Sequence, residues 1–117
     1  MVTGMIKKFK NSFKYSCNGL KATFKREYSF QIEIVAIPIL IILLILLPCS
    51  PVRKMVMMAS YLIIPCLELL NSAIEKLADR LTTEHDVAIE FVKDAASASI
   101  LLALIQVVII WIGCLCF

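Results

Sequence analysis

Five polar side chains in the segment CLELLNSAIEKLADR, residues 66–80, are spaced so that one face of a helix would carry them all. They are Glu68, Asn71, Ser72, Glu75 and Asp79. Separations of three, one, three and four residues place them in a stripe about 16 Å long, at about 1.5 Å of rise per residue. Carboxylate and amide oxygens are the ligands that hard cations prefer. The spacing therefore predicts an oxygen-rich site along one helix.

Such a stripe can support more than one chemistry. Mg²⁺ is usually held by one or two carboxylates together with substrate phosphates, and a further carboxylate can act as a general base on a hydroxyl. Glu68 stands within the apolar run CLELL, and an ionisable residue at membrane depth indicates function. The residues predict phosphoryl transfer to a lipid alcohol. The acids alone would equally suit proton or cation transport, and the segment after residue 70 could also be a solvated helical extension without a purpose.

Further polar residues occur where two other helices would reach the same membrane surface. Glu27 and Glu33 stand beside the first apolar run, and Lys93, Asp94 and Ser97 stand at the start of the third. Acids from three helices that converge at one interface indicate a site, in which Lys93 could neutralise phosphate charge.

The glycine-rich loops of common nucleotide-binding proteins are absent. The sequence has no GxxxxGK[ST], GxGxxG, HRD or DFG motif, and its glycines are Gly4, Gly19 and Gly113. Any nucleotide site must therefore be built from side chains on helices. The lone His85 could contact a nucleotide or could simply be solvated.

The elements that would position these residues are membrane helices. The chain is 61% hydrophobic and 18% charged, whereas a soluble domain is about 45–50% apolar and about 25% charged. Three apolar runs predict spans at about residues 30–47, 52–70 and 95–117, since a spanning helix needs about 20 residues. We expect an all-α membrane protein in which residues 1–117 form a single domain.

The N-terminal region predicts a helix that lies on the membrane surface, at about residues 5–26. It alternates aromatic and aliphatic residues with basic ones, as interfacial helices do, whereas nucleic-acid binding is the competing interpretation and fits a three-span protein poorly. Residues 1–26 carry seven bases and no acid, which places the N-terminus in the cytoplasm and the C-terminus outside. Arg53 and Lys54 in the outer loop oppose this orientation. Residues 81–94 are then a cytoplasmic hairpin.

Several motifs resemble those of the prokaryotic diacylglycerol kinase family of small membrane lipid kinases. They are ELLNSAIEKLADR followed by KDAAS, YSCNGLKATF at 15–24, REYSFQIE at 26–33 and IIWIGC at 109–114. The resemblance implies a homotrimeric bundle of three-span subunits in the bacterial inner membrane. It also implies active sites that neighbouring subunits share at the cytoplasmic surface.

The resemblance also implies roles for individual residues. Glu68 matches the general base, and Glu27 and Glu75 match the carboxylates that hold Mg²⁺ with ATP. The residues that match ATP-contacting positions are Lys8, Tyr15, Glu27, Glu75, Glu84, His85, Asp86, Lys93 and Asp94. Those that match positions near the lipid substrate are Lys8, Ser16, Phe30, Glu33, Glu68, Asn71 and Ser97. Diacylglycerol is the expected acceptor, with undecaprenol, the acceptor of the family's other type, as the alternative.

Overall fold

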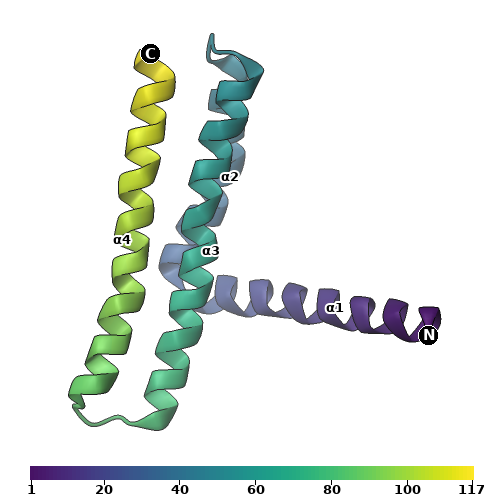
Figure 1. Ribbon diagram of the computed structural model, residues 1–117, viewed down its shortest axis with the longest axis vertical. Helices are drawn as coiled ribbons and strands as arrows, with labels where there is room; N and C mark the ends of the chain where they lie inside the picture. Colours follow the sequence, from purple (N-terminus) through teal and green to yellow (C-terminus); the bar gives the residue numbers. More distant parts are fainter.

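The structure is a computed structural model that describes residues 1–117, and it consists of four helices and no strands. They are α1 (Val2–Arg26), α2 (Tyr28–Leu46), α3 (Pro51–Leu81) and α4 (Val87–Cys116). The last three are long and apolar enough to cross a membrane, which confirms the expected all-α fold with three spans. Figure 1 shows α2, α3 and α4 running side by side, with α1 projecting sideways from them.

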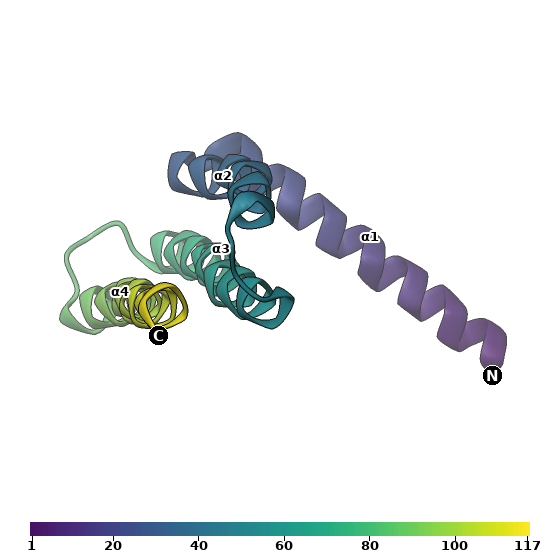
Figure 2. The ribbon, with the colours of Figure 1, turned by 90° about the horizontal axis from the view of Figure 1, so that it is seen from above.

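The three spans lie in a row with α3 in the middle. Helix α4 packs along one side of α3 and α2 along another, while α2 and α4 do not contact each other. The view from above in Figure 2 shows this arrangement, with α1 leading away from the start of α2. A space between α2 and α4 therefore remains open along the face of α3.

Most apolar side chains point outward. Only 10 of the 117 residues are buried, so one chain cannot form a core of its own and its apolar faces require lipid or protein around them. Helix α1 contains no buried residue and carries basic residues opposite its aromatic ones, which suits the predicted surface position.

The connection between α3 and α4 is shorter than the sequence predicts. The hairpin expected over residues 81–94 is wrong in extent, because α3 ends at Leu81 and α4 already begins at Val87. The Asp86 side chain caps α4 by accepting from the backbone N–H groups of Ala88 at 2.8 Å and Ile89 at 3.2 Å. We call this part of the molecule the connection end. The 31 residues of α3 extend about 46 Å, against about 30 Å of hydrocarbon, so polar turns project beyond the membrane there.

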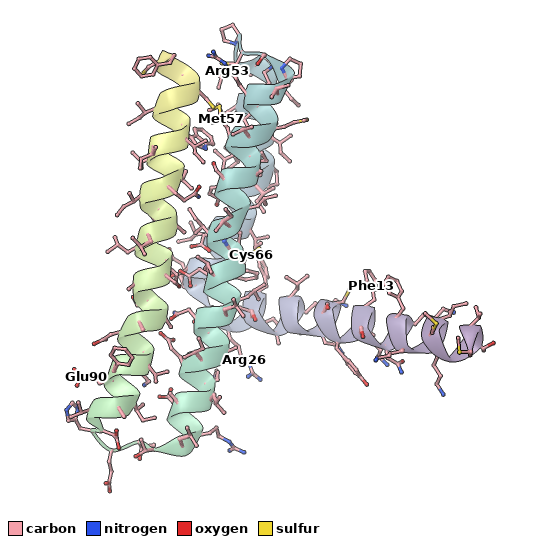
Figure 3. All side chains as sticks on the ribbon, viewed as in Figure 1. Phe13, Arg26, Arg53, Met57, Cys66 and Glu90 are labelled. Carbon is pink, nitrogen blue, oxygen red and sulfur yellow. The ribbon has the colours of Figure 1, made fainter.

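Basic side chains join the helices at the opposite end, where residues 47–50 link α2 to α3. Arg53 donates to the carbonyl oxygens of Cys114 at 3.0 Å and Phe117 at 2.9 Å, in the last turn of α4. Lys54 donates to Ile45 O near the end of α2 at 3.2 Å. Helix C-termini carry unpaired carbonyl groups and favour cations. The two bases that oppose the predicted orientation thus have a local structural role (Figure 3).

The few polar side chains in the middle of the spans donate hydrogen bonds to the backbone of neighbouring helices. Gln106 donates to Ser60 O at 2.8 Å, and the Trp111 indole donates to Met57 O at 3.0 Å, both between α4 and α3. The Tyr61 hydroxyl donates to Glu33 O at 2.7 Å and so links α3 to α2. These hydrogen bonds fix how far each span is shifted along its neighbour.

Candidate active site

A cleft opens between α2 and α4 towards the connection end, and α3 forms its floor. It has a volume of about 340 Å³, and it exists because α2 and α4 flank α3 without contacting each other. Its lining comes from the elbow between α1 and α2 and from all three spans. The lining residues are Glu27, Ser29, Glu68, Asn71, Ser72, Glu75, Ser97, Ile100, Leu101 and Leu104.

The polar stripe of α3 accounts for the floor of this cleft. Glu68, Asn71, Ser72 and Glu75 all line it, as expected for side chains at steps of three and four on a helix. Glu27 joins them because it stands between α1 and α2 in an extended backbone conformation, φ −108° and ψ 112°. The chain turns at this point, which brings a carboxylate from the first elbow towards the middle of α3.

Glu33 extends the acidic lining towards the membrane. Its carboxyl group neighbours that of Glu68. Its Oε2 atom is buried without a hydrogen-bond partner. A buried polar atom of this kind is uncommon in folded proteins and indicates a place where a ligand or proton is received.

Asn71 and Glu75 form a pair beside this site. The Asn71 Nδ2 atom donates to Glu75 Oε1 at 3.2 Å, while Asn71 Oδ1 is buried without a partner. The free amide oxygen next to a carboxylate suits a hard cation. No three His, Cys, Asp or Glu side chains gather as a metal site.

A second polar hollow, of about 400 Å³, surrounds the connection between α3 and α4. It collects five of the residues expected near ATP, namely Glu84, His85, Asp86, Lys93 and Asp94. Lys93 Nζ lies 2.6 Å from Asp79 Oδ1, and His85 Nε2 lies 3.4 Å from Glu90 Oε2. Figure 3 shows Glu90 at the start of α4 in this region. The sequence did not predict the pairing of Lys93 with Asp79, which ties this hollow to the end of the acidic stripe.

One chain does not bring the predicted residues of α1 to the cleft. Lys8, Tyr15 and Ser16 are exposed on the projecting helix, and the Ser16 hydroxyl donates to Ser12 O at 3.1 Å. Figure 3 shows this helix, marked by Phe13, well away from the spans. Phe30 is 1% exposed and reaches an apolar groove at the junction of α1 and α2.

Several residues that line the cleft were not predicted from the sequence as site residues. The sequence feature that could have identified Ser29 is its position two residues after Glu27. Ile100, Leu101 and Leu104 form an apolar wall above Ser97, and their steps of one, three and four along α4 mark one face of that helix. The cleft thus joins an acidic floor to an apolar wall on its membrane side, which suits a substrate with a polar head and an apolar body.

Comparisons with known proteins identify the family to which the sequence is similar. The profile of the family described as prokaryotic diacylglycerol kinase matches residues 14–115. A diacylglycerol kinase from Haemophilus influenzae is 43% identical over 107 residues, which cover 92% of this chain and 91% of that protein. Diacylglycerol kinases from Escherichia coli K12 and Helicobacter pylori 26695 are 33% and 37% identical, and the matches cover 83% and 90% of this chain and 80% and 84% of those proteins. This chain therefore belongs to the prokaryotic diacylglycerol kinase family.

Proposed function

We propose that the protein transfers the terminal phosphate of ATP to diacylglycerol and so makes phosphatidic acid, at the cytoplasmic face of the bacterial inner membrane. The observation that carries this proposal is the single cleft in which Glu27, Glu68 and Glu75 meet an apolar wall at the membrane boundary. The printed names of the relatives, all diacylglycerol kinase, favour diacylglycerol over undecaprenol as the acceptor.

Glu68 is the proposed general base. It lies at the apolar side of the stripe, beside Glu33 and closer to the membrane centre than Glu75, where the hydroxyl of a membrane lipid would enter. Its carboxylate accepts the hydroxyl proton as the lipid oxygen forms a bond to the terminal phosphorus and the bond from that phosphorus to ADP breaks. General-base catalysis of this kind contributes about 10²–10⁴-fold to a rate.

Glu27 and Glu75 are the proposed ligands of Mg²⁺, which would neutralise charge on the phosphates. Asn71 holds the Glu75 carboxylate in place through its Nδ2 hydrogen bond. Lys93, which is positioned by Asp79, would hold phosphate oxygens from the side of the connection end. These groups act mainly by orientation and charge, as phosphoryl transfer requires.

A homotrimer would complete the site. Lys8, Tyr15 and Ser16 lie on an arm that extends away from its own cleft, so these residues could serve the cleft of a neighbouring subunit. The outward apolar faces of α2 and α4, on which few side chains are buried, provide surface for such an assembly.

The pairing of the mid-span polar groups argues against cation transport. A conduction path needs polar groups that line it across the bilayer. Gln106, Tyr61 and Trp111 instead donate to neighbouring helices, and the acidic residues gather at one end. The site is one-sided, as a reaction with cytoplasmic ATP requires.

The acceptor can be tested with purified protein in mixed micelles, by measuring kcat/KM for diacylglycerol and for undecaprenol with Mg²⁺ and ATP. We expect the larger value for diacylglycerol. A larger value for undecaprenol would reassign the acceptor. No product from either lipid, together with cation flux in liposomes, would overturn the kinase proposal.

A further inference from the structure

A second, smaller cavity lies between the end of α1 and the middle of α3. Its volume is about 130 Å³, against about 340 Å³ for the cleft. The residues that line it are Ala22, Thr23, Arg26, Glu27, Leu69, Ser72, Ala73 and Lys76. Glu27 and Ser72 line both spaces, so the small cavity adjoins the candidate active site. We call it the basic cavity.

Two cations border the basic cavity without an acidic partner. Arg26 comes from the last turn of α1 and Lys76 from α3, and Figure 3 shows Arg26 at the junction of these helices. The only ion pairs in the chain join Lys93 to Asp79 and His85 to Glu90. Even Glu27, which lines the same cavity, forms no ion pair with either base. Arg26 and Lys76 are therefore free to bind an anion from outside the chain.

The chemistry and size of the basic cavity suit one phosphate group. An arginine guanidinium matches the oxygens of a phosphate with two parallel donors, and lysine adds a point charge. The buried Ser72 contributes a hydroxyl. The cavity has less than half the volume of the cleft, so a nucleoside or an acyl chain would not fit beside the phosphate. The single negative charge of Glu27 leaves a net positive lining.

The location suggests where that phosphate comes from. In the proposed reaction, which this inference assumes, the lipid gains a phosphate in the cleft while its acyl chains stay in the membrane. The new headgroup must then leave the cleft while it stays at the same depth in the membrane. The basic cavity adjoins the cleft, and Glu27 and Ser72 lie between the two spaces. Phosphates of the nucleotide are the other source of the same chemical group.

We propose that the basic cavity is a phosphate-binding subsite of the enzyme, formed by Arg26 and Lys76, that holds the phosphate monoester of the phosphorylated lipid or a phosphate of the nucleotide. Arg26 and Lys76 are not among the groups proposed to hold the cation or accept the proton, although the proposed cation ligand Glu27 also lines the cavity. The subsite therefore affects binding and release, and it does not take part in the proton transfer.

The test uses the full chain with both bases changed, Arg26→Gln with Lys76→Gln. The matched control is Lys25→Gln with Arg80→Gln, which removes the same charge from the same two helices at positions outside the basic cavity. Equilibrium binding of radiolabelled short-chain phosphatidic acid is measured in detergent without ATP, with diacylglycerol of the same chain length as the uncharged comparison. The KM for Mg·ATP is measured in parallel, and circular dichroism checks that each variant is folded.

We expect the Arg26 and Lys76 double variant to bind phosphatidic acid about tenfold more weakly, the effect of losing about 1.4 kcal/mol of charge-assisted hydrogen bonding. Diacylglycerol binding by the double variant should be unchanged. The control variant should bind phosphatidic acid as the unaltered protein does. A rise in the KM for Mg·ATP of similar size, with phosphatidic acid binding unchanged, would support the subsite and identify the nucleotide as its source. If neither quantity changes, or if the control variant changes both equally, the subsite does not exist.

The binding measurement needs no turnover, so it separates this inference from the proposed function. Weakened phosphatidic acid binding in a protein that phosphorylates no lipid would leave the subsite standing and the kinase proposal overturned. If the unaltered protein is an active kinase and the double variant keeps normal phosphatidic acid binding and a normal KM for Mg·ATP, the subsite alone is overturned.

Discussion

Glu68 and Glu75 lie about two turns apart on α3, yet their surroundings differ. Glu68 follows the apolar part of the helix and lies against Glu33, whereas Glu75 accepts a hydrogen bond from Asn71 at 3.2 Å. A carboxylate near apolar surroundings suits proton transfer, and one beside an amide oxygen suits a hard cation. The two residues should therefore affect different kinetic quantities.

Replacing the proposed base should reduce the rate of the chemical step. Glu68→Gln keeps the size of the side chain and its ability to hydrogen-bond, but the amide cannot accept the proton. We expect kcat to fall by roughly 10²–10⁴-fold, with the apparent affinities for Mg²⁺ and ATP almost unchanged. Steady-state kinetics at saturating lipid measure both. A loss that appeared mainly in the KM for ATP would show that Glu68 is not the base.

Replacing the proposed cation ligand Glu75 should weaken binding of Mg·ATP. Glu75→Gln removes one anionic oxygen donor, so part of the activity should return at high Mg²⁺. A Mg²⁺ titration of both variants decides the assignment. Rescue of Glu68→Gln but not of Glu75→Gln would mean that the two roles are reversed. Asp79→Asn, further along the helix and engaged with Lys93, should have a smaller effect than either.

At the scale of helices, hydrogen bonds between α3 and α4 keep the floor and one wall of the cleft in register. Gln106 donates to Ser60 O at 2.8 Å, and Trp111 donates both to Met57 O at 3.0 Å and to Ser60 Oγ at 3.2 Å. The buried Ser60 and Met57 belong to α3. These contacts fix how Ser97 and Leu101 of α4 lie opposite Glu68.

Removing one of these hydrogen bonds should lower stability more than chemistry. Gln106→Leu keeps an apolar contact but leaves Ser60 O with only its bond within the helix. We expect the free energy of unfolding to fall by about 0.6 kcal/mol and by no more than about 1.7 kcal/mol. Reversible unfolding in mixed detergent micelles measures it. Val108→Leu, at an exposed position on the same helix, is the control, and an equal loss there would contradict a specific role for Gln106.

The sequence could predict what depends on a single helix. The spacing of Glu68, Asn71 and Glu75 correctly places them on one face, because helical geometry is local. It could not predict which residues meet across helices, such as Lys93 with Asp79 or Arg53 with the end of α4, since these contacts depend on how the helices are shifted relative to each other. The overlong hairpin has a related cause. The charged Glu90, Lys93 and Asp94 favoured a loop over residues 87–94, but these residues form the first turns of the helix that Asp86 caps.

At the scale of the whole molecule, one chain is an open arrangement. Helix α1 leads away from the spans (Figure 1), α2 and α4 do not contact each other, and only 10 of 117 residues are buried. A carboxylate at membrane depth, such as the partly exposed Glu68, is costly without partners. Sites completed by a neighbouring subunit would supply them.

Shared sites predict complementation between inactive chains. A chain with Lys8→Gln and Tyr15→Ala lacks the contribution from α1, and a chain with Glu68→Gln lacks the base. If a site combines α1 of one subunit with the cleft of another, mixed oligomers contain some intact sites and regain part of the activity. Activity is measured after the two chains are mixed in detergent and reconstituted. Mixed oligomers that form, as shown by two different affinity tags, yet stay inactive would contradict sharing between α1 and the cleft.

The central claim is that the acidic cleft transfers phosphate from ATP to a lipid hydroxyl. The most direct measurement follows the label from ATP carrying ³²P in its terminal phosphate into extracted lipid, with purified protein and diacylglycerol in micelles. The account predicts labelled phosphatidic acid with Mg²⁺ present, loss of the label from lipid when Mg²⁺ is chelated, and almost none with Glu68→Gln. Labelled lipid formed equally well by Glu68→Gln, or no labelled lipid from the unaltered protein with Mg²⁺, would contradict it.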